Sequence, residues 1–320
     1  MRVCAVAGGV GSARFCTGLA RVLDPGELTV VVNTGDDERI RGLLVCPDLD
    51  TVLYHLAAST DWGRGWGMAA ESFVADERYR HLVDQLADER TDLQEWFALG
   101  DRDLATHLLR ARLLETGSTL TQAVGALARA LGIAATVLPM SDDPVRTKLT
   151  VTTGEELDFQ EYFVRRKQQD EISAVAYAGA VAARPAPGVI EAIASADVVV
   201  IPPSNPPLSI GPVLAVPGIR DAIASARGVR VGVSPIVGGR ALKGPADRVL
   251  ASLGHDVSPV GVARIYEGLL DAFVLDEADA SRAADVDAVG PRAVVCDTIM
   301  SGPEEAARVA KTVLDHVLRA

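Results

Sequence analysis

Seven short runs rich in Val and other apolar residues recur along this chain, and amphipathic helical stretches separate most of them. The runs lie at residues 3–7, 28–33, 134–140, 196–204, 229–235, 272–277 and 292–298. The helical stretches lie at residues 12–23, 119–132, 188–195, 217–226, 244–253 and 303–319. Most runs are too apolar for a strand with one face in water, so they predict strands covered on both faces. The alternation therefore predicts an α/β fold around a mostly parallel sheet of about six strands, joined by right-handed crossovers.

Two segments interrupt this rhythm. Residues 51–118 are helix-like and carry all three tryptophans of the chain. Residues 147–177 have the pattern of antiparallel strands, with a first strand before a turn at Gly154–Glu155, a second over 157–166 and a third in the segment ISAVAYAG. We therefore expect a single α/β domain over residues 1–320, with a helical insertion at about 51–118 and a β appendage at about 147–177.

Composition excludes several classes of partner and site. The net charge of −12 would repel nucleic acid and anionic membranes, so we expect neither as a partner. No stretch approaches the roughly 20 apolar residues of a membrane span, and glycines interrupt the N-terminal apolar run too early for a signal peptide. The four cysteines form no CxxC pair and the five histidines no HExxH motif, which argues against a zinc site. We expect a soluble cytoplasmic protein with free thiols.

The first predicted strand leads through a glycine-rich turn directly into a helix. Glycines let the backbone approach a phosphate closely, and a helix N-terminus offers free N–H groups and a partial positive charge. The turn is no Walker A loop, because Gly-Lys-Ser/Thr does not follow, and Asn33 stands where a nicotinamide site would have an acidic ribose-binding residue. The alternative is a tight turn without a ligand. The candidate phosphate-binding residues are Gly8, Gly9, Gly11, Ser12 and Arg14.

Two pairs of aspartates follow the second predicted strand. Asp36 and Asp37 would lie beside the glycine turn if the first two strands are neighbours. Adjacent carboxylates near a phosphate usually require a cation between them, and Mg²⁺ prefers oxygen ligands. Asp48 and Asp50 flank the start of the next helix, where an aspartate is also common as a helix cap.

Further polar residues cluster at helix starts and after later strands. In the segment GDRDLATH, Arg102 has the fork geometry that suits a phosphate or a carbonyl, although an Asp-Arg-Asp run is also an ordinary ion-paired helix start. Because ligands bind outside the carboxyl ends of parallel strands, we expect the loops after strands to converge on one site. The remaining candidates are Thr106 and His107 in that segment, then Ser204, Asn205, Ser209 and Gly211, and finally Gly238 and Gly239.

Taken in order, the segments GGVGSARF, VVNTGDD, CPDLDTVLY, LGDRDLATH, LPMSDDPV, PSNPPLSIGP and SPIVGG resemble the 2-phospho-L-lactate transferase family. Its actinobacterial members are phosphoenolpyruvyl transferases. The resemblance implies a Mg²⁺-dependent homodimer with a Rossmann-like core that works in the biosynthesis of coenzyme F-420. Such an enzyme moves a phosphoenolpyruvyl or 2-phospho-L-lactyl group from a guanosine diphosphate-linked donor to the ribityl hydroxyl of 7,8-didemethyl-8-hydroxy-5-deazariboflavin, and GMP leaves.

The resemblance also implies roles for the candidate residues. Asp36 and Asp37 would hold Mg²⁺, and Asp36 and Asp50 would be catalytic, with Asp50 or Asp48 accepting the ribityl proton. Acceptor binding would use Asp48, Asp50, Arg102, Thr106 and His107. The glycine turn and the loops at Ser204–Gly211 and Gly238–Gly239 would bind the nucleotide and its phosphates.

Two alternatives belong to other classes. A related family of nucleotide-sugar-binding regulatory proteins shares the glycine-rich first strand and the Asp-Asp loop, without turnover. A nicotinamide-dependent dehydrogenase is disfavoured by Asn33 and by the lack of a His/Lys acid–base pair.

The segment containing Trp62 and Trp66, together with GDRDLATH, favours the enolpyruvyl donor over the lactyl donor.

Overall fold

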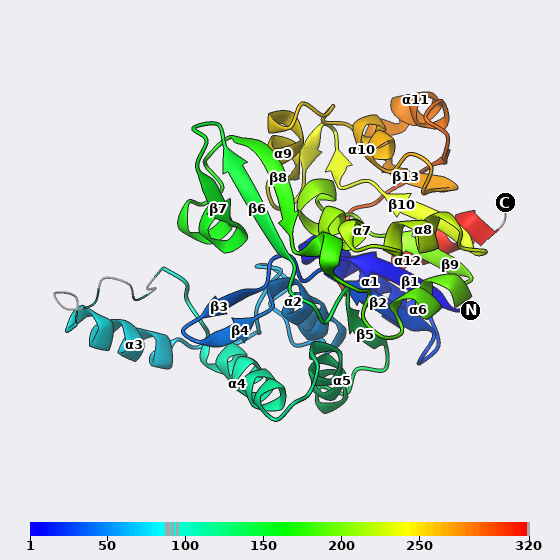
Figure 1. Ribbon diagram of the computed structural model, residues 1–320. Helices are drawn as coiled ribbons and strands as arrows, with labels where there is room; N and C mark the ends of the chain where they lie inside the picture. Colours follow the sequence, from blue (N-terminus) through cyan, green and yellow to red (C-terminus); the bar gives the residue numbers. More distant parts are fainter. Residues whose placement is uncertain (87–89, 91–92, 94–95, 319–320) are drawn as a thin grey trace.

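The computed structural model of the chain describes residues 1–86, 90, 93 and 96–318, and its centre is a seven-stranded parallel sheet (Figure 1). Every neighbouring pair in this sheet is parallel. All seven apolar runs form its strands, so the sheet is slightly wider than expected and the predicted fold class is confirmed. In spatial order the strands are β14 (Arg292–Cys296), β13 (Ala272–Asp276), β10 (Val229–Val233), β9 (Val198–Ile201), β1 (Val3–Ala7), β2 (Leu28–Val32) and β5 (Thr136–Pro139).

The strand order reverses beside β1. From β1 the chain builds outward through β2 to β5, then returns to the other side of β1 and builds outward through β9, β10, β13 and β14. Ala5 pairs with Val30 of β2 on one side and with Val200 of β9 on the other. At such a switch point the two connections leave in opposite directions, which opens a crevice at the carboxyl ends of the strands.

Helices cover both faces of the sheet because alternate strand residues point to opposite sides. From β1, Val3, Ala5 and Ala7 join a core with α1 (Gly9–Val22), α2 (Pro47–Leu56), α5 (Leu120–Ala130) and α12 (Pro303–Leu318). Cys4 and Val6 join a second core on the opposite face. The helices of that face are α6 (Val189–Ser195), α7 (Gly211–Ala215), α8 (Ile219–Ala224), α9 (Ala246–Ser252), α10 (Pro259–Ile265) and α11 (Ala283–Asp287).

Between β2 and β5 the chain forms the hairpin of β3 (Glu38–Ile40) and β4 (Leu43–Val45), and then α2, α3 (Val74–Asp84), α4 (Asp101–Glu115) and α5. Helix α3 projects away from the sheet, at the left of Figure 1. Asp101 holds its first turn by accepting hydrogen bonds from the N–H groups of Val74 (3.0 Å) and Ala75 (2.9 Å). Residues 87–89, 91–92 and 94–95 of the predicted insertion lie outside the described residues.

The segment predicted as a β appendage contains a three-stranded antiparallel sheet of β7 (Glu156–Asp158), β6 (Arg146–Val151) and β8 (Ile172–Ala178). The strand expected over 157–166 is wrong beyond Asp158, because a π-helical segment, η1 (Glu161–Arg165), follows. The rings of Phe159 and Phe163 stack with centroids 5.4 Å apart. This four-residue spacing places both rings on one face of a helical turn, whereas a strand would align residues two apart.

The remaining elements are short. They are the hairpin β11 (Ile236–Val237) and β12 (Arg240–Ala241), the 3-10 segments η2 (Ala180–Ala182) and η4 (Glu277–Arg282), and the π-helical segment η3 (Pro206–Ile210). Throughout the described ranges, every helix is too short or too polar to cross a bilayer.

Candidate active site

The loops that follow β1 and β9 are locked together at the switch point. Ser12, in the first turn of α1, shares a hydrogen bond between its hydroxyl and that of Ser204, and the Ser204 hydroxyl also donates to the carbonyl oxygen of Gly8. A Cβ atom at Gly11 would overlap the carbonyl oxygen of Pro203, so only glycine fits there. The glycine-rich turn is therefore a fixed platform at the amino end of a 14-residue helix.

Asp48 lies directly against this turn. A Cβ atom at Gly8 would lie 2.8 Å from Asp48 Oδ2 and 2.9 Å from the Cβ of Ser209. The Asp48 carboxylate accepts a hydrogen bond from the N–H of Gly9, at the positive end of α1. A phosphate bound at the same amides would meet this carboxylate, and two anions at such a distance require a cation between them.

Asn33 and Asp36 complete a buried polar cluster with Asp48. The side-chain amide of Asn33 donates to Asp48 Oδ2 at 2.9 Å and lies 3.5 Å from Asp36 Oδ1, while Asn33 Oδ1 accepts from the N–H of Gly35 at 2.8 Å. The N–H of Asp48 donates to Asp36 Oδ2 at 3.1 Å. Both carboxylates are nearly inaccessible to water, at 2% exposure for Asp36 and 9% for Asp48.

Burial makes the charged forms of these aspartates costly. Burial, together with the charges of Asp48 and Asp37, raises the pKa of Asp36 well above its ordinary range. Burial also raises the pKa of Asp37 to about 7 and that of Asp48 to about 6. Carboxylates with pKa values near neutrality, crowded on one another, are typical of functional sites.

Asp36 and Asp37, which line one cavity, are the acids of this loop that could hold a divalent cation. Their donor atoms are carboxylate oxygens, which Mg²⁺ prefers. One oxygen of Asp37, Oδ1, is buried and has no hydrogen-bond partner in the described part of the chain. A cation would satisfy that atom and would offset the mutual repulsion that raises the pKa of Asp36.

A cavity of about 310 Å³ opens beside this cluster. Asp36 and Asp37 line it from the loop after β2, and Arg146, Thr147 and Phe159 line it from the β6–β8 sheet and the segment after β7. The Gln160 side chain donates to the main-chain oxygen of Asp36 at 2.9 Å, which joins that sheet to the carboxylate loop. Glu38, Arg39 and Asp158 also line the cavity, which thus combines four carboxylates, two guanidinium groups and an aromatic ring.

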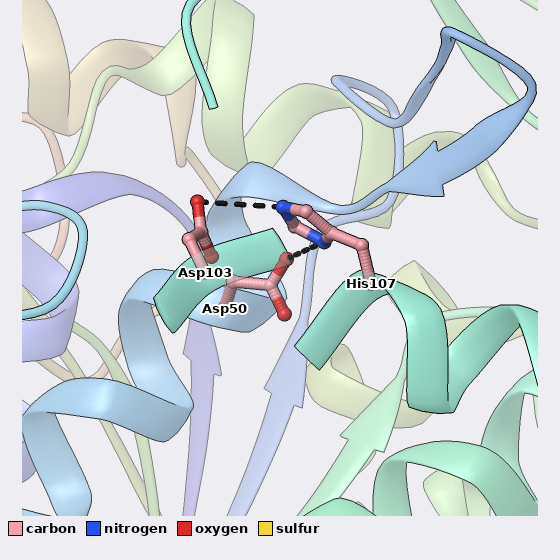
Figure 2. Close-up of side chains that lie close together, drawn as sticks. All are labelled: Asp50, Asp103 and His107. Carbon is pink, nitrogen blue, oxygen red and sulfur yellow. Dashed lines mark ion pairs between the residues drawn. The ribbon is translucent and has the colours of Figure 1, made fainter. Parts of the chain in front are cut away.

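Asp50 lies apart from the Asp36–Asp48 pair, in a separate buried network. Arg110, which is fully buried, binds both of its carboxylate oxygens, at 3.1 Å from Nη1 to Oδ2 and by a closer contact from Nη2 to Oδ1. His107 lies between the two acids in Figure 2, with Nδ1 3.6 Å from Asp50 Oδ2 and Nε2 3.3 Å from Asp103 Oδ2. The two aspartates and the histidine have a spacing that suits a metal ion. Arg110 already supplies the positive charge there, so we interpret the group as an ion-pair network.

This network fixes helix α4 against α2. Tyr54 of α2 donates to Asp103 Oδ1 of α4 at 2.5 Å, and Thr106 is also hydrogen-bonded to the Tyr54 hydroxyl. Burial opposes ionisation of Asp103, but its hydrogen bonds with His107 and Tyr54 hold its pKa below the ordinary range. Asp50, Thr106 and His107, which the sequence analysis assigns to acceptor binding, therefore lie within a side-chain network that occupies them.

Both arginines predicted to meet a ligand have protein partners. Arg14 donates to the carbonyl oxygen of Trp62 and lies 5.1 Å from the centroid of the Trp62 ring, so it anchors the loop around Trp62 to α1. Arg102 is exposed and donates to the carbonyl oxygen of Ala69 at 3.2 Å. Its main-chain N–H donates to Glu71 at 2.7 Å.

The candidate residues that follow β9 face two different sides of η3. Ser209 faces Gly8 and Gly9, with its Oγ 3.4 Å from the position of a Cβ at Gly9. Asn205 caps η3 by accepting from the N–H of Leu208 at 3.1 Å, and Gly211 abuts the hydroxyl of Tyr177 on the opposite side.

Gly238 and Gly239 form the two-residue turn between β11 and β12, with φ angles of 58° and 77°. The N–H of Gly238 donates to Asp279 at 2.9 Å. A two-residue hairpin turn with positive φ angles at both positions favours glycine because of the backbone conformation. The turn therefore explains both glycines without a bound ligand.

Sequence reasoning missed Arg110, Asn33 as a partner of the acids, and Gln160. Arg110 follows His107 by three residues, which places both on one helix face, and this spacing is the only sequence signal for it. Asn33 lies in the segment VVNTGDD, but that segment does not predict its contact with Asp48, and Gln160 lies in none of the quoted motifs; both roles depend on contacts between separate elements.

The chain is thus an α/β protein with a rigid glycine-rich turn and a cluster of carboxylates at the switch point of a doubly wound parallel sheet. Residues 3–313 match the family described as 2-phospho-L-lactate transferase CofD. A phosphoenolpyruvate transferase of Streptomyces griseus is 44% identical over 320 residues, covering 98% of each chain. A 2-phospho-L-lactate transferase of Methanosarcina barkeri is 38% identical over 307 residues, covering 96% of each. This chain belongs to the 2-phospho-L-lactate transferase family, as its motifs predicted.

A solved structure shares the fold at a greater distance. A member of the UPF0052 family from Bacillus halodurans superposes with a TM-score of 0.62 and 18% identity, covering 98% of each chain. At this identity the similarity extends to the fold, and the activity has to be argued from the site.

Proposed function

We propose that the protein transfers a phosphoenolpyruvyl group from a guanosine diphosphate-linked donor to the ribityl hydroxyl of 7,8-didemethyl-8-hydroxy-5-deazariboflavin, and releases GMP. The observation that carries the proposal is the meeting of the glycine platform with Asp36 and Asp48 at the switch point, in a chain of this family. In the reaction, the hydroxyl oxygen bonds to the phosphorus that bears the enolpyruvyl group, and the bridging P–O bond to GMP breaks.

The donor's diphosphate would lie on the amides of the glycine platform. No N-cap side chain covers the first turn of α1, where Asp48 already takes the N–H of Gly9, and the Ser12–Ser204 hydrogen bond holds the platform rigid. Rigid donors that need no rearrangement during the reaction stabilise developing charge most effectively.

Asp36 and Asp37 would hold Mg²⁺, with Asp48 beside them. When bound there, the cation would neutralise the phosphate charges that oppose attack by an alcohol. Asn33 orients the acids, because its single amide donates to Asp48 and approaches Asp36.

Asp48 is better placed than Asp50 to accept the proton of the ribityl hydroxyl. Its carboxylate borders the glycine platform, and its pKa of about 6 suits a base that works near neutral pH. Both oxygens of Asp50 are bound by Arg110. We therefore assign Asp50 to positioning α2, whose first turn also carries Asp48.

The enolpyruvyl donor is favoured over the lactyl donor by the relatives. The Streptomyces griseus relative, named for phosphoenolpyruvate, is 44% identical, against 38% for the Methanosarcina barkeri relative named for 2-phospho-L-lactate. The two acids differ by two hydrogens, so the difference in rate between donors has to be measured.

The test is to incubate the protein with the deazaflavin precursor, Mg²⁺ and each of the two guanosine-linked donors, and to measure products by mass spectrometry. We expect the enolpyruvyl-phosphate ester of the precursor and one GMP per product. Binding of donor and acceptor without any product would contradict the proposal and would support a regulatory protein that binds ligand without turnover.

We also propose that the protein is a homodimer, on the resemblance to its family alone. Light scattering at micromolar concentration should give twice the chain mass of 33.6 kDa, and a monomer would contradict this.

A further inference from the structure

A second cavity, of about 480 Å³, lies on the side of η3 that faces away from the glycine platform. One wall consists of Pro206 and Pro207 of η3. The other walls include Val175 of β8, Leu214 of α7, Ile265 of α10 and Leu253, which follows α9. Ser209, on the same short segment as the two prolines, faces Gly8 and Gly9 instead. The cavity is therefore separate from the site that the proposed function uses, and the inference below does not depend on that function.

The cavity contains a buried hydroxyl that lacks a partner. Tyr266 lines it and is 2% exposed, and its hydroxyl has no hydrogen-bond partner in the part of the chain that the structure describes. The neighbouring hydroxyl of Tyr177 donates to the carbonyl oxygen of Pro207 at 2.6 Å. Buried hydroxyls are nearly always hydrogen-bonded, so an unpaired one that borders a cavity indicates a missing acceptor.

The mouth of the cavity is basic. Arg220 of α8 lines it, is exposed, and forms no ion pair with any residue in the described ranges, and His255 lines it as well. Apolar walls, one inner hydroxyl donor and an outer cation are features of small-molecule sites.

We propose that this cavity is a second binding site, for a small molecule with a planar apolar body and one anionic group. The body would pack between Pro206, Leu214 and Ile265, and the anionic group would contact Arg220 at the mouth. Tyr266 would donate its hydroxyl hydrogen to an acceptor on the body. The volume is sufficient for a ligand of one or two rings.

The probe for the test is 7-methoxycoumarin-3-carboxylate, a fluorescent molecule that combines two fused rings, a ring carbonyl oxygen that can accept a hydrogen bond, and one carboxylate. Fluorescence titration of the intact protein should give saturable binding at one site. Tyr266→Phe should weaken binding about fivefold, through loss of one hydrogen bond. Arg220→Gln should weaken it about threefold, because the charge is exposed and screened.

Matched variants outside the cavity provide the controls. Tyr79→Phe removes a hydroxyl from α3 and Arg227→Gln removes an exposed charge after α8, and both should leave the affinity unchanged. Ala215→Trp, which adds a ring to the lining, should abolish the saturable component, and circular dichroism would show whether each variant folds.

Two results would overturn the inference. One is absence of saturable binding, or equal affinity in the wild type and in folded Tyr266→Phe, Arg220→Gln and Ala215→Trp proteins. The other is competitive displacement of the probe by GDP with Mg²⁺, which would make the cavity part of the nucleotide site. If the protein lacks transferase activity but still binds the probe as described, the proposed function fails and this inference stands.

Discussion

The main-chain N–H of Asp48 donates a 3.1 Å hydrogen bond to the Oδ2 of Asp36, so the start of α2 is tied to the loop after β2. This bond brings two buried carboxylates into one site, although repulsion between their charges disfavours the arrangement. Proteins maintain such a costly pair mainly where a cation or a proton offsets it. We therefore place the proposed functional centre of the protein at this cluster.

Asp36→Asn should reduce kcat by about 100-fold or more, because it removes a carboxylate ligand and its charge. The amide oxygen can still accept from Asp48, and the raised pKa of Asp36 means that a neutral group suits the folded state, so the melting temperature should not fall. Steady-state kinetics and thermal unfolding on the same protein measure both. The exposed Asp221→Asn is the matched control. Normal activity of Asp36→Asn at low Mg²⁺ would rule out the ligand role.

Stabilisation by Mg²⁺ should be larger at pH 8 than at pH 5.5. The pKa values of Asp37 and Asp48, about 7 and 6, are raised above the ordinary value of 3.8. When folding raises the pKa of a carboxyl group, that group stabilises the folded state at pH values below its unfolded-state pKa. This stabilisation is lost as the pH rises through the folded-state pKa values, here about 6 to 7. A cation replaces the protons there and binds best when both acids are ionised.

The measurement is the increase in melting temperature on adding a fixed MgCl₂ concentration at each pH. Comparing protein with and without Mg²⁺ at one pH cancels other titrating groups, such as His55, whose pKa burial lowers to about 4. Asp37→Asn should reduce the difference between the two pH values. Equal increments at pH 5.5 and pH 8 in the wild type would mean that the cation does not bind these acids.

Arg110→Met should destabilise the fold by about 3–5 kcal/mol, because it leaves the Asp50 charge buried without its partner. Adding Asp50→Asn to Arg110→Met should recover much of this loss, since the uncompensated charge is gone. Denaturant unfolding of the two single variants and the double variant gives the coupling between the residues. If Asp50→Asn alone lowers kcat far more than it lowers stability, Asp50 acts in the reaction and our positioning role is wrong.

Gly11→Ala should prevent correct folding or strongly destabilise the protein, because the added Cβ would overlap the carbonyl oxygen of Pro203. The control is Gly125→Ala in α5, where the nearest atom is the Arg129 side chain at 3.6 Å. Alanine is preferred to glycine in a helix by roughly 1 kcal/mol, so this variant should be as stable as the wild type or more stable. Equal stability of the two variants would show that the loop after β1 and the loop after β9 do not approach each other closely at Gly11 and Pro203.

The strands and the glycine platform could be predicted from the sequence because their signals are local. Each buried strand is a continuous apolar run, and Gly8, Gly9 and Gly11 stand together before a helix. The ion pair of Asp50 with Arg110 joins residues 60 positions apart, and no local pattern distinguishes that arginine from an exposed one. Because the sequence does not reveal Arg110 as its partner, Asp50 is, from the sequence alone, a candidate for a free catalytic base.

Arg14 illustrates the same limit. Its position in the glycine motif predicts contact with a phosphate, yet its guanidinium lies against the Trp62 ring and carbonyl from a loop about 50 residues later. The orientation of a long side chain on a helix depends on which other segment packs against that helix. The glycine motif does not contain this information. The η1 segment differs for a related reason, since stacking of Phe159 on Phe163 favours a helical turn over a strand.

The central claim is that Asp48 accepts the proton as the ribityl hydroxyl attacks, and single-turnover kinetics of Asp48→Asn test it most directly. With enzyme in excess over the guanosine-linked donor, and with Mg²⁺ and the deazaflavin precursor present, we predict unchanged binding of both substrates and a rate of GMP formation at least about 100-fold below that of the wild type. The asparagine oxygen can still accept from Asn33 and Gly9, so the fold should persist. GMP formation at the wild-type rate in the folded variant would contradict the claim.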